Sequence, residues 1–230
     1  LSATIAGLKG ISRASEDIVI AREIALAESL DCPVHICHVS THSGVRLIRD
    51  AKRAGIKVTA ETCPHYFALT DDVIRDFNTN TKVNPPIREE VDKQAILAGL
   101  QDGTIDCIVT DHAPHHIDDK NVEYDVAAFG ISGIETSFGF AITNLYKAGV
   151  LSLNQIADKM SGAPARILGL DGGEIAEGKV ADFTIANLDE KWVIEPEKFV
   201  SKGKNNPFGG TELFGAVKYT IVDGNVKYSK

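Results

Sequence analysis

Apolar and polar residues follow two different spacings along the first half of this chain. Apolar residues spaced three and four apart predict helices, whereas short unbroken apolar runs predict strands that are buried on both faces. Strand and helix alternate along the chain. Helices are predicted over residues 12–30, 43–54 and 89–100, and extended segments over residues 34–39, 57–62, 80–86 and 105–111.

Polar side chains stand near the end of each extended segment. His38 and Asp111 lie at the ends of the first and the last, His65 closely follows the second, and Asn84 lies in the third. Their intervals suit successive βα units, in which every parallel strand brings its polar end to the same rim. Four such units predict an α/β fold that is half of an eight-stranded βα barrel.

The pattern changes after Gly169. Residues 174–186 and 214–228 alternate between apolar and polar side chains as strands do. Asp223 and Gly224 form a hairpin turn signal within the second of these stretches. The tail therefore predicts the strands of a small antiparallel domain.

Composition and charge are typical of a soluble globular chain. Of the 230 residues, 43% are hydrophobic and 24% are charged, which supplies enough apolar side chains for a core. The net charge of −8 and the scattered Lys and Arg residues argue against nucleic acid as a partner. No apolar run approaches the roughly 18 residues that span a bilayer, and the start lacks a signal-peptide pattern. We therefore expect a cytoplasmic protein without a membrane partner.

Residues 105–116 carry the most informative chemistry in the sequence. An apolar run ends in Asp111, and His112, His115 and His116 follow it closely. If the barrel prediction holds, then His38, His65 and Asp111 converge at one rim. Two imidazoles and a carboxylate suit Zn²⁺ or a similar divalent ion. Each histidine taken alone is more often structural, so it is their shared position at strand ends that favours a metal site.

A metal at this rim favours hydrolysis of an amide, or the reverse reaction. The ion lowers the pKa of water toward ~7, and the carboxylate of Asp111 can accept a proton and return it to a leaving nitrogen. Asn84 and His115 are candidates for holding a polar substrate. The alternative for Asn84 is a turn residue before two prolines. His112 points away from Asp111, so we expect a supporting or structural role for it.

Motifs along nearly the whole chain resemble those of the class-I dihydroorotases in the amidohydrolase superfamily. The combination of the third and fourth motifs is the most specific, because the related hydantoinases and allantoinases usually differ at both. The motifs are His38-Val-Ser-Thr, Glu61-Thr-Cys-Pro-His65-Tyr, Lys82-Val-Asn84-Pro-Pro-Ile-Arg88, Thr110-Asp111-His-Ala-Pro-His115, Gly130-Ile-Ser-Gly-Ile-Glu-Thr136, Pro164-Ala-Arg-Ile-Leu-Gly169, Gly178-Lys-Val-Ala-Asp182 and Asn206-Pro-Phe.

The resemblance implies a role for each matching residue. His38 and His65 would bind one zinc ion, and Asp111 would bind the other while serving as base and acid. Asn84, the backbone of Ala113, and His115 would contact the carboxylate and the ring of the substrate. The implied reaction is the reversible, zinc-dependent cyclisation of N-carbamoyl-L-aspartate to L-dihydroorotate in pyrimidine biosynthesis.

The chain lacks part of what the resemblance requires. The His-x-His pair on the first barrel strand, the metal-bridging Lys or Asp on the fourth, and an arginine for the substrate carboxylate belong to a half that is not in this sequence. The chain also starts at Leu1 and has a single methionine, Met160, which suggests a fragment or a processed product. A second zinc site would need residues from outside this chain.

We therefore expect the C-terminal half of a TIM-like (β/α)8 metal-dependent hydrolase barrel. Residues 1–168 would hold strands five to eight with their helices, and residues 169–230 the C-terminal part of a small β-sandwich domain. The partner would be the missing N-terminal half or further copies in a homo-oligomer. Open barrel edges are costly unless they are paired.

Two other functions stay open at this point. One is a different cyclic amidase, an allantoinase or a hydantoinase, which would hydrolyse those rings and ignore dihydroorotate. The other is a non-catalytic dihydroorotase-like domain that serves as a structural partner. Such domains typically lose metal ligands, whereas His38, His65 and Asp111 are all present. Elemental analysis separates the two classes, because a scaffold should contain no metal.

Overall fold

A computed structural model of the chain describes residues 2–230, and these divide into two compact units. The first unit runs to Ser137 and includes the later segment Pro196–Pro207. The second contains Phe138–Glu195 and Phe208–Lys230. The predicted division at residue 168, between barrel strands five to eight and part of a small sandwich domain, stays a prediction.

The first unit alternates strands and helices as the sequence predicts. None of the helices in the described part of the chain is long and apolar enough to cross a membrane. The elements of this unit are α1 (Ser2–Ile5), α2 (Arg13–Leu30), β1 (Val34–Ile36), α3 (His42–Arg53), β2 (Val58–Thr62), α4 (Pro64–Ala68), the 3-10 helices η1 (Asp71–Asp76) and η2 (Thr79–Thr81), α5 (Glu90–Asp102), β3 (Cys107–Ile108), α6 (Ile117–Lys120) and the 3-10 helix η5 (Pro196–Lys198).

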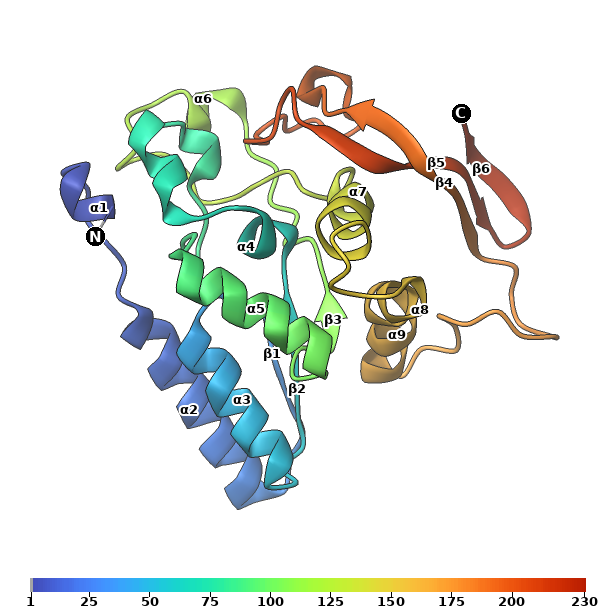
Figure 1. Ribbon diagram of the computed structural model, residues 1–230, viewed down its shortest axis with the longest axis horizontal. Coiled ribbons are helices and arrows are strands. Elements are labelled where there is room, and N and C mark those ends of the chain that lie inside the picture. The colour runs from blue at the N-terminus through green and yellow to red at the C-terminus, as the bar shows by residue number, and fades with distance from the viewer. Residues whose placement is uncertain (1) are drawn as a thin grey trace. The chain divides into compact units, whose positions relative to one another are not determined.

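The three strands form a parallel sheet in the order β1-β2-β3. Helices α2, α3 and α5 lie side by side along one face of this sheet (Figure 1). Ile36 and Ala60 point toward the helices and are buried, as are Ile48 of α3 and Leu100 of α5. Alternation along a strand places the intervening polar residues of β1 and β2 on the opposite face.

The prediction of a fourth parallel strand over residues 80–86 is wrong. The structure has η2 at the start of this stretch, followed by an irregular segment with a cis bond between Asn84 and Pro85. Two consecutive prolines lack the N–H groups that a central strand donates to its neighbours. The hydroxyl of Tyr66 instead donates a hydrogen bond to the carbonyl of Pro85 at 2.6 Å. The sheet therefore has three strands in the described residues.

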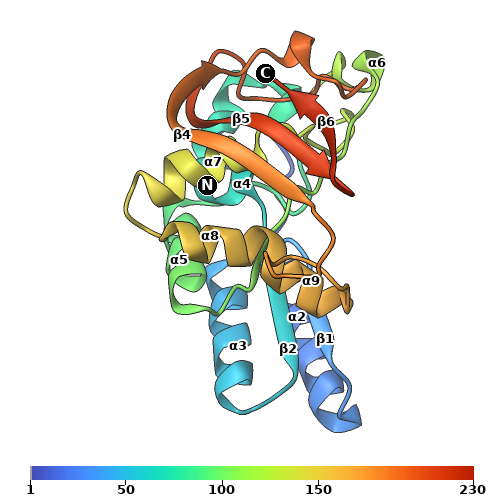
Figure 2. The same cartoon turned by 90° about the vertical axis from the view of Figure 1, so that its right-hand side faces the viewer.

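The second unit joins a short helical part to an antiparallel sheet in the order β4-β5-β6, which Figure 2 shows. Asp223 and Gly224 connect β5 to β6, so the predicted hairpin is confirmed. The larger sandwich to which these strands would belong stays a prediction. The elements are α7 (Ser137–Phe140), the π-helical η3 (Ala141–Tyr146), α8 (Leu153–Ala157), the π-helical η4 (Asp158–Gly162), α9 (Ala163–Leu168), β4 (Phe183–Val193), β5 (Glu212–Val222) and β6 (Asn225–Ser229).

Helix η3 packs closely against strand β5 at Gly215. A Cβ atom at this position would lie 2.9 Å from Cγ1 of Ile142, and the residue has a φ of +89° that favours glycine. The N–H of Phe214 donates to the hydroxyl of Thr143 at 2.8 Å. Backbone contact and glycine geometry together fix the helix on the strand.

Candidate metal and substrate site

The carboxyl ends of the three parallel strands position the predicted metal ligands. His38 lies two residues beyond β1, His65 is the second residue of α4 directly after β2, and Asp111 lies three residues beyond β3. Backbone pairing continues past the strands, because Val39 N–H donates to Glu61 O at 2.8 Å and Val109 N–H donates to Thr62 O at 3.0 Å. All three residues therefore lie near the carboxyl ends of strands, with His38 and Asp111 just beyond the strands and not within them as predicted.

His38 and Asp111 share an unusual backbone conformation. Their φ angles are +41° and +44°, in the left-handed region that residues other than glycine rarely adopt. Both residues lie just beyond strands β1 and β3, which are shorter than the extended segments that the sequence predicts. Strained residues of this kind gather at functional sites, where surrounding contacts hold them in place.

The structure gathers His65 and Asp111 with a residue that the sequence reasoning left out. One ligand atom from each of Cys63, His65 and Asp111 lies within 4.8 Å of the other two. His38 is outside this group of three but near enough to His65 to influence its ionisation. Cys63 directly follows β2, and its position at a strand end was the signal that could have identified it.

Two ring nitrogens at this site suit a metal ion. Nδ1 of His38 and Nε2 of His65 are buried and have no hydrogen-bond partner within residues 2–230. A buried polar atom without a partner carries a desolvation cost of about 1–3 kcal/mol. Imidazole nitrogens next to a carboxylate are a donor set that Zn²⁺ prefers. The residues present therefore fit a divalent ion.

Burial keeps the His65 imidazole and the Cys63 thiol uncharged. Burial, with a smaller contribution from the nearby His38, lowers the pKa of His65 to about 3, so the imidazole is neutral at pH 7. Burial also raises the pKa of the Cys63 thiol, and the negative charges of Asp111 and Glu61 add to this effect. A neutral imidazole has a lone pair to give, whereas a protonated thiol is a poor ligand.

A second group of possible metal ligands lies on the sheet face opposite the helices. His35, Cys37 and Glu61 each bring one ligand atom within 4.8 Å of the other two. The ring of His35 is already held on both sides, with Nδ1 2.8 Å from Thr59 Oγ1 and Nε2 3.0 Å from Glu61 Oε2. Unlike His38 and His65, this histidine has both of its nitrogens partnered.

The predicted substrate residues lie on two loops of the same unit. Asn84 is exposed beside its cis bond to Pro85. The N–H of Ala113 donates to Ile131 O at 3.0 Å, so this backbone group already has an internal partner. Nε2 of His115 is 2.8 Å from Phe129 O. The three positions are ordered, but their contact with a substrate stays a prediction.

Arg88, which ends the Lys82–Arg88 motif that contains Asn84, has a structural role. Its guanidinium is buried and donates to Ile11 O at 2.9 Å, to Ser40 Oγ at 3.1 Å and to Glu16 Oε2 at 3.2 Å. Glu16 also accepts the Ser40 N–H at 2.8 Å and the Ser40 hydroxyl. This network fixes the turn that follows His38.

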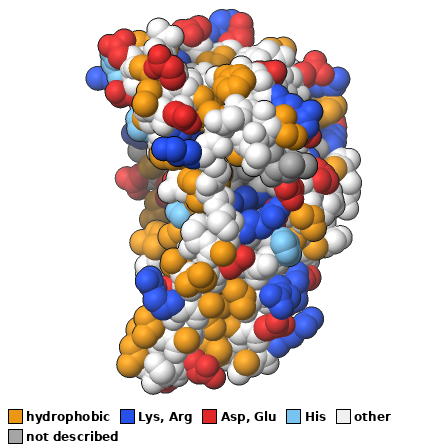
Figure 3. Space-filling model, turned by 90° about the vertical axis from the view of Figure 1, so that its left-hand side faces the viewer, with side chains coloured by type: hydrophobic (Ala, Val, Ile, Leu, Met, Phe, Trp, Pro, Cys, Tyr) orange, Lys and Arg blue, Asp and Glu red, His pale blue; other side chains and the backbone are white. Residues whose placement is uncertain are grey.

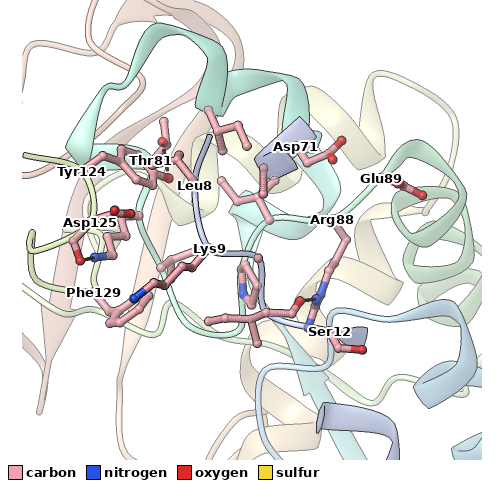
Figure 4. A pocket seen from close by; sticks show the side chains of 18 of the residues that line it. Leu8, Lys9, Ser12, Asp71, Thr81, Arg88, Glu89, Tyr124, Asp125 and Phe129 are labelled. Atoms are coloured by element: carbon pink, nitrogen blue, oxygen red, sulfur yellow. Dashed lines mark hydrogen bonds between the residues drawn. The ribbon is translucent and has the colours of Figure 1, made fainter. Parts of the chain in front are cut away.

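A cleft of about 680 Å³ lies beside this network, and Figure 4 shows the side chains that line it. Lys9, Lys82 and Arg88 contribute positive charge, and Nζ of Lys82 lies 4.6 Å from the ring centroid of Phe129. His38, His65 and Asp111 do not line this cleft. It is therefore separate from the predicted metal ligands.

Residues 118–133, which the sequence presents as a polar loop rich in turn signals, are held by a buried lysine. Nζ of Lys120 donates to the carbonyls of Ala128 at 2.6 Å, Thr79 at 3.0 Å and Lys82 at 3.4 Å. Burial of the Lys120 ammonium, with a smaller contribution from the charge of Lys82, lowers its pKa to about 8. This anchor ties the loop to η2.

Stability should depend on the ionisation of Lys120 between about pH 8 and pH 10.5. The unfolded chain binds the proton more tightly in this interval, so the contribution of Lys120 to the free energy of unfolding rises with pH, by at most about 1.4 kcal/mol per unit. Urea denaturation across this pH range measures the free energy of unfolding of wild type and of Lys120→Met. The difference between the two values isolates the contribution of Lys120. A difference that stays constant with pH would contradict the lowered pKa.

Comparison with known proteins places these observations in a family. A model of the amidohydrolase family matches residues 9–227. The chain is 53% identical to a dihydroorotase of Acetivibrio thermocellus over 97% of its length, and 55% identical to one of Ruminiclostridium cellulolyticum over 96%. It covers 52% of each, so it spans about half the length of these relatives.

A solved structure has the same fold as the chain. The L-hydantoinase (dihydropyrimidinase) of Arthrobacter aurescens superimposes with a TM-score of 0.89 at 32% identity, over 93% of this chain and 49% of that one. The parallel sheet with helices on one face agrees with this likeness. The family model matches residues 9–227, which is nearly the whole chain. The chain belongs to the amidohydrolase family.

Proposed function

We propose that this chain is the C-terminal half of a dihydroorotase, which interconverts N-carbamoyl-L-aspartate and L-dihydroorotate. The observation that supports this most directly is the 53% identity to a dihydroorotase over 97% of the chain. The motifs around His38, Asn84 and Asp111 agree with it. Strands β1 to β3 would be the last strands of the barrel, and β4 to β6 part of the small sandwich domain.

The metal centre would use the buried imidazoles and the carboxylate described above. His38 and His65 would give their unpartnered nitrogens to one zinc ion, and Asp111 would hold a second ion together with residues outside this chain. Such an ion polarises the amide carbonyl and lowers the pKa of water near it. Neutral imidazoles are required for this role, and the low pKa of His65 satisfies the requirement.

Asp111 would move the proton during the reaction. In ring hydrolysis its carboxylate accepts a proton from the attacking water and gives it to the ring nitrogen as the amide bond breaks. In cyclisation the same carboxyl group acts in the opposite order. Asn84, the backbone of Ala113, and His115 would hold the carboxylate and ring of the substrate. Positioning of this kind lowers the barrier by fixing the reacting atoms in place.

The surface of the first unit supports further barrel strands beyond this chain. Helix α2 exposes Ile18, Leu26 and Leu30 by 68%, 46% and 71%. Figure 3 shows a patch of hydrophobic side chains in its lower part. Among the described residues, strand β1 pairs with β2 alone. A neighbouring βα unit would cover the patch and pair the edge.

A substrate panel tests the proposed function. The full-length protein that contains this chain should hydrolyse dihydroorotate with a kcat/KM at least about 10²-fold above that for hydantoin or allantoin. The likeness to L-hydantoinase makes hydantoin the necessary comparison. Preference for hydantoin would favour a hydantoinase, and a protein with neither activity nor metal would be a non-catalytic partner.

A further inference from the structure

The segment Pro196–Pro207 belongs to the first unit, although the chain on either side of it belongs to the second. The carboxylate of Glu135 holds it by accepting the N–H groups of Val200 and Ser201 at 3.1 and 3.0 Å. Gly203 approaches the loop after β3 so closely that a Cβ atom would lie 2.6 Å from Cβ of Pro114. The tail thus returns to the loop that carries His115.

Asn205 uses its whole side chain to join two parts of this loop. Its Nδ2 donates to Ala113 O at 2.9 Å and to Gly130 O at 3.0 Å. Its Oδ1 accepts the N–H of His115 at 2.9 Å and lies 2.9 Å from the hydroxyl of Ser132. Because carbonyls surround one end and hydrogen donors the other, the network admits one orientation of the amide.

Asn205 holds the backbone of two predicted substrate-binding residues, Ala113 and His115. It binds the carbonyl of Ala113 and the N–H of His115, and only Pro114 lies between them. Gly130, whose carbonyl also accepts a hydrogen bond from Asn205, packs tightly against both residues. A Cβ atom at this position would lie 2.7 Å from Cβ of Ala113 and 2.8 Å from Nε2 of His115. A small displacement of the amide would therefore move both substrate contacts.

We propose that Asn205 is a positioning residue for substrate binding, because its buried amide fixes the backbone of Ala113 and His115. The inference rests on the proposed function. Asn205 is 5% exposed and all of its hydrogen-bonding atoms are engaged within the protein. It touches neither His38, His65 nor Asp111 through any of these bonds. Its loss should therefore weaken substrate binding more than it affects the metal or proton transfer.

Steady-state kinetics of Asn205→Asp in the full-length, zinc-loaded protein test this proposal. Aspartate has the same size but cannot donate to Ala113 O and Gly130 O. We expect KM for dihydroorotate to rise about tenfold or more while kcat changes less than about threefold. The zinc content should stay at the wild-type value. Ser132→Ala, which removes one partner of the same amide, should raise KM by about two- to threefold if the aspartate variant does not fold.

Asn206→Ala is the matched control. Asn206 is 4% exposed and donates to Ser132 O at 2.9 Å, but it does not bind Ala113 or His115 through this bond. Its replacement should lower thermal stability and leave KM unchanged. Lower kcat or zinc content at constant KM in Asn205→Asp or Ser132→Ala would overturn the positioning role. If the wild-type protein does not hydrolyse dihydroorotate, then both the proposed function and this inference are wrong.

Discussion

Replacement of Asp111 by asparagine should lower kcat for dihydroorotate hydrolysis by about 10²- to 10⁴-fold, the usual contribution of a general acid and base. Asparagine keeps the shape of the side chain and tolerates the left-handed backbone at this position, where φ is +44°. The amide cannot accept the proton of water or return one to the ring nitrogen. Circular dichroism should show an unchanged fold, and stopped assays in both directions should show the same loss.

The control for this substitution is Asp118→Asn in the same connecting segment. The Asp118 side chain is 86% exposed and its carboxylate lies 3.3 Å from Nδ1 of His116. An exposed pair of this kind contributes little, so activity should change less than about twofold. An Asp111→Asn protein that keeps half of the wild-type kcat would exclude proton transfer through this carboxylate.

Local apolar patterns predicted the three parallel strands well. A strand that is buried in a sheet is recognised from its own apolar residues, without knowledge of the strands that pair with it. The stretches that end near His38 and Asp111 are mostly apolar, with His35 and Asp106 as polar residues within them, and they contain strands β1 and β3. Both strands are shorter than predicted, and a residue with left-handed backbone follows each of them, His38 after β1 and Asp111 after β3. That conformation leaves no mark in composition, since neither residue is a glycine.

The error at residues 80–86 has a different origin. Asn84 was placed on a strand because its spacing from His65 and Asp111 suited a βα unit, although two prolines follow it. The prolines decided the outcome, because a strand between β2 and β3 would have needed their missing N–H groups. Spacing therefore predicted a strand at Asn84, whereas the structure has an irregular segment there.

Contacts between distant parts of the chain could not be predicted from local pattern. Asn205 binds Ala113 and His115 across 92 and 90 positions of sequence, and its only sequence signal was a neighbouring Asn-Pro-Phe motif. Lys120 likewise looks like an ordinary surface lysine within a polar segment, yet it is 3% exposed. The roles of both residues can be recognised only in the folded structure, where backbone carbonyls from distant parts of the chain surround their side chains.

Replacement of His65 by leucine should change the stability of the protein in opposite directions with and without zinc. Nε2 of His65 is buried without a partner among residues 2–230, so the metal-free protein bears the cost of its desolvation. Leucine has a similar volume and no polar atom, and it should raise the metal-free free energy of unfolding by about 1 kcal/mol or more. Denaturation in the presence of a chelator measures this gain.

With zinc bound, the order should reverse. Zinc at 100 times its dissociation constant stabilises wild type by about 2.7 kcal/mol, because it binds only the folded state. The leucine variant should lose most of this increment together with the zinc that His65 ligates, whereas His116→Leu, whose side chain is 70% exposed, should keep both. If His65→Leu retains the full zinc content and the full stabilisation, then His65 is a packing residue. In that case His38 and Asp111 would hold the metal without it, with Cys63 as the remaining candidate in the group of three.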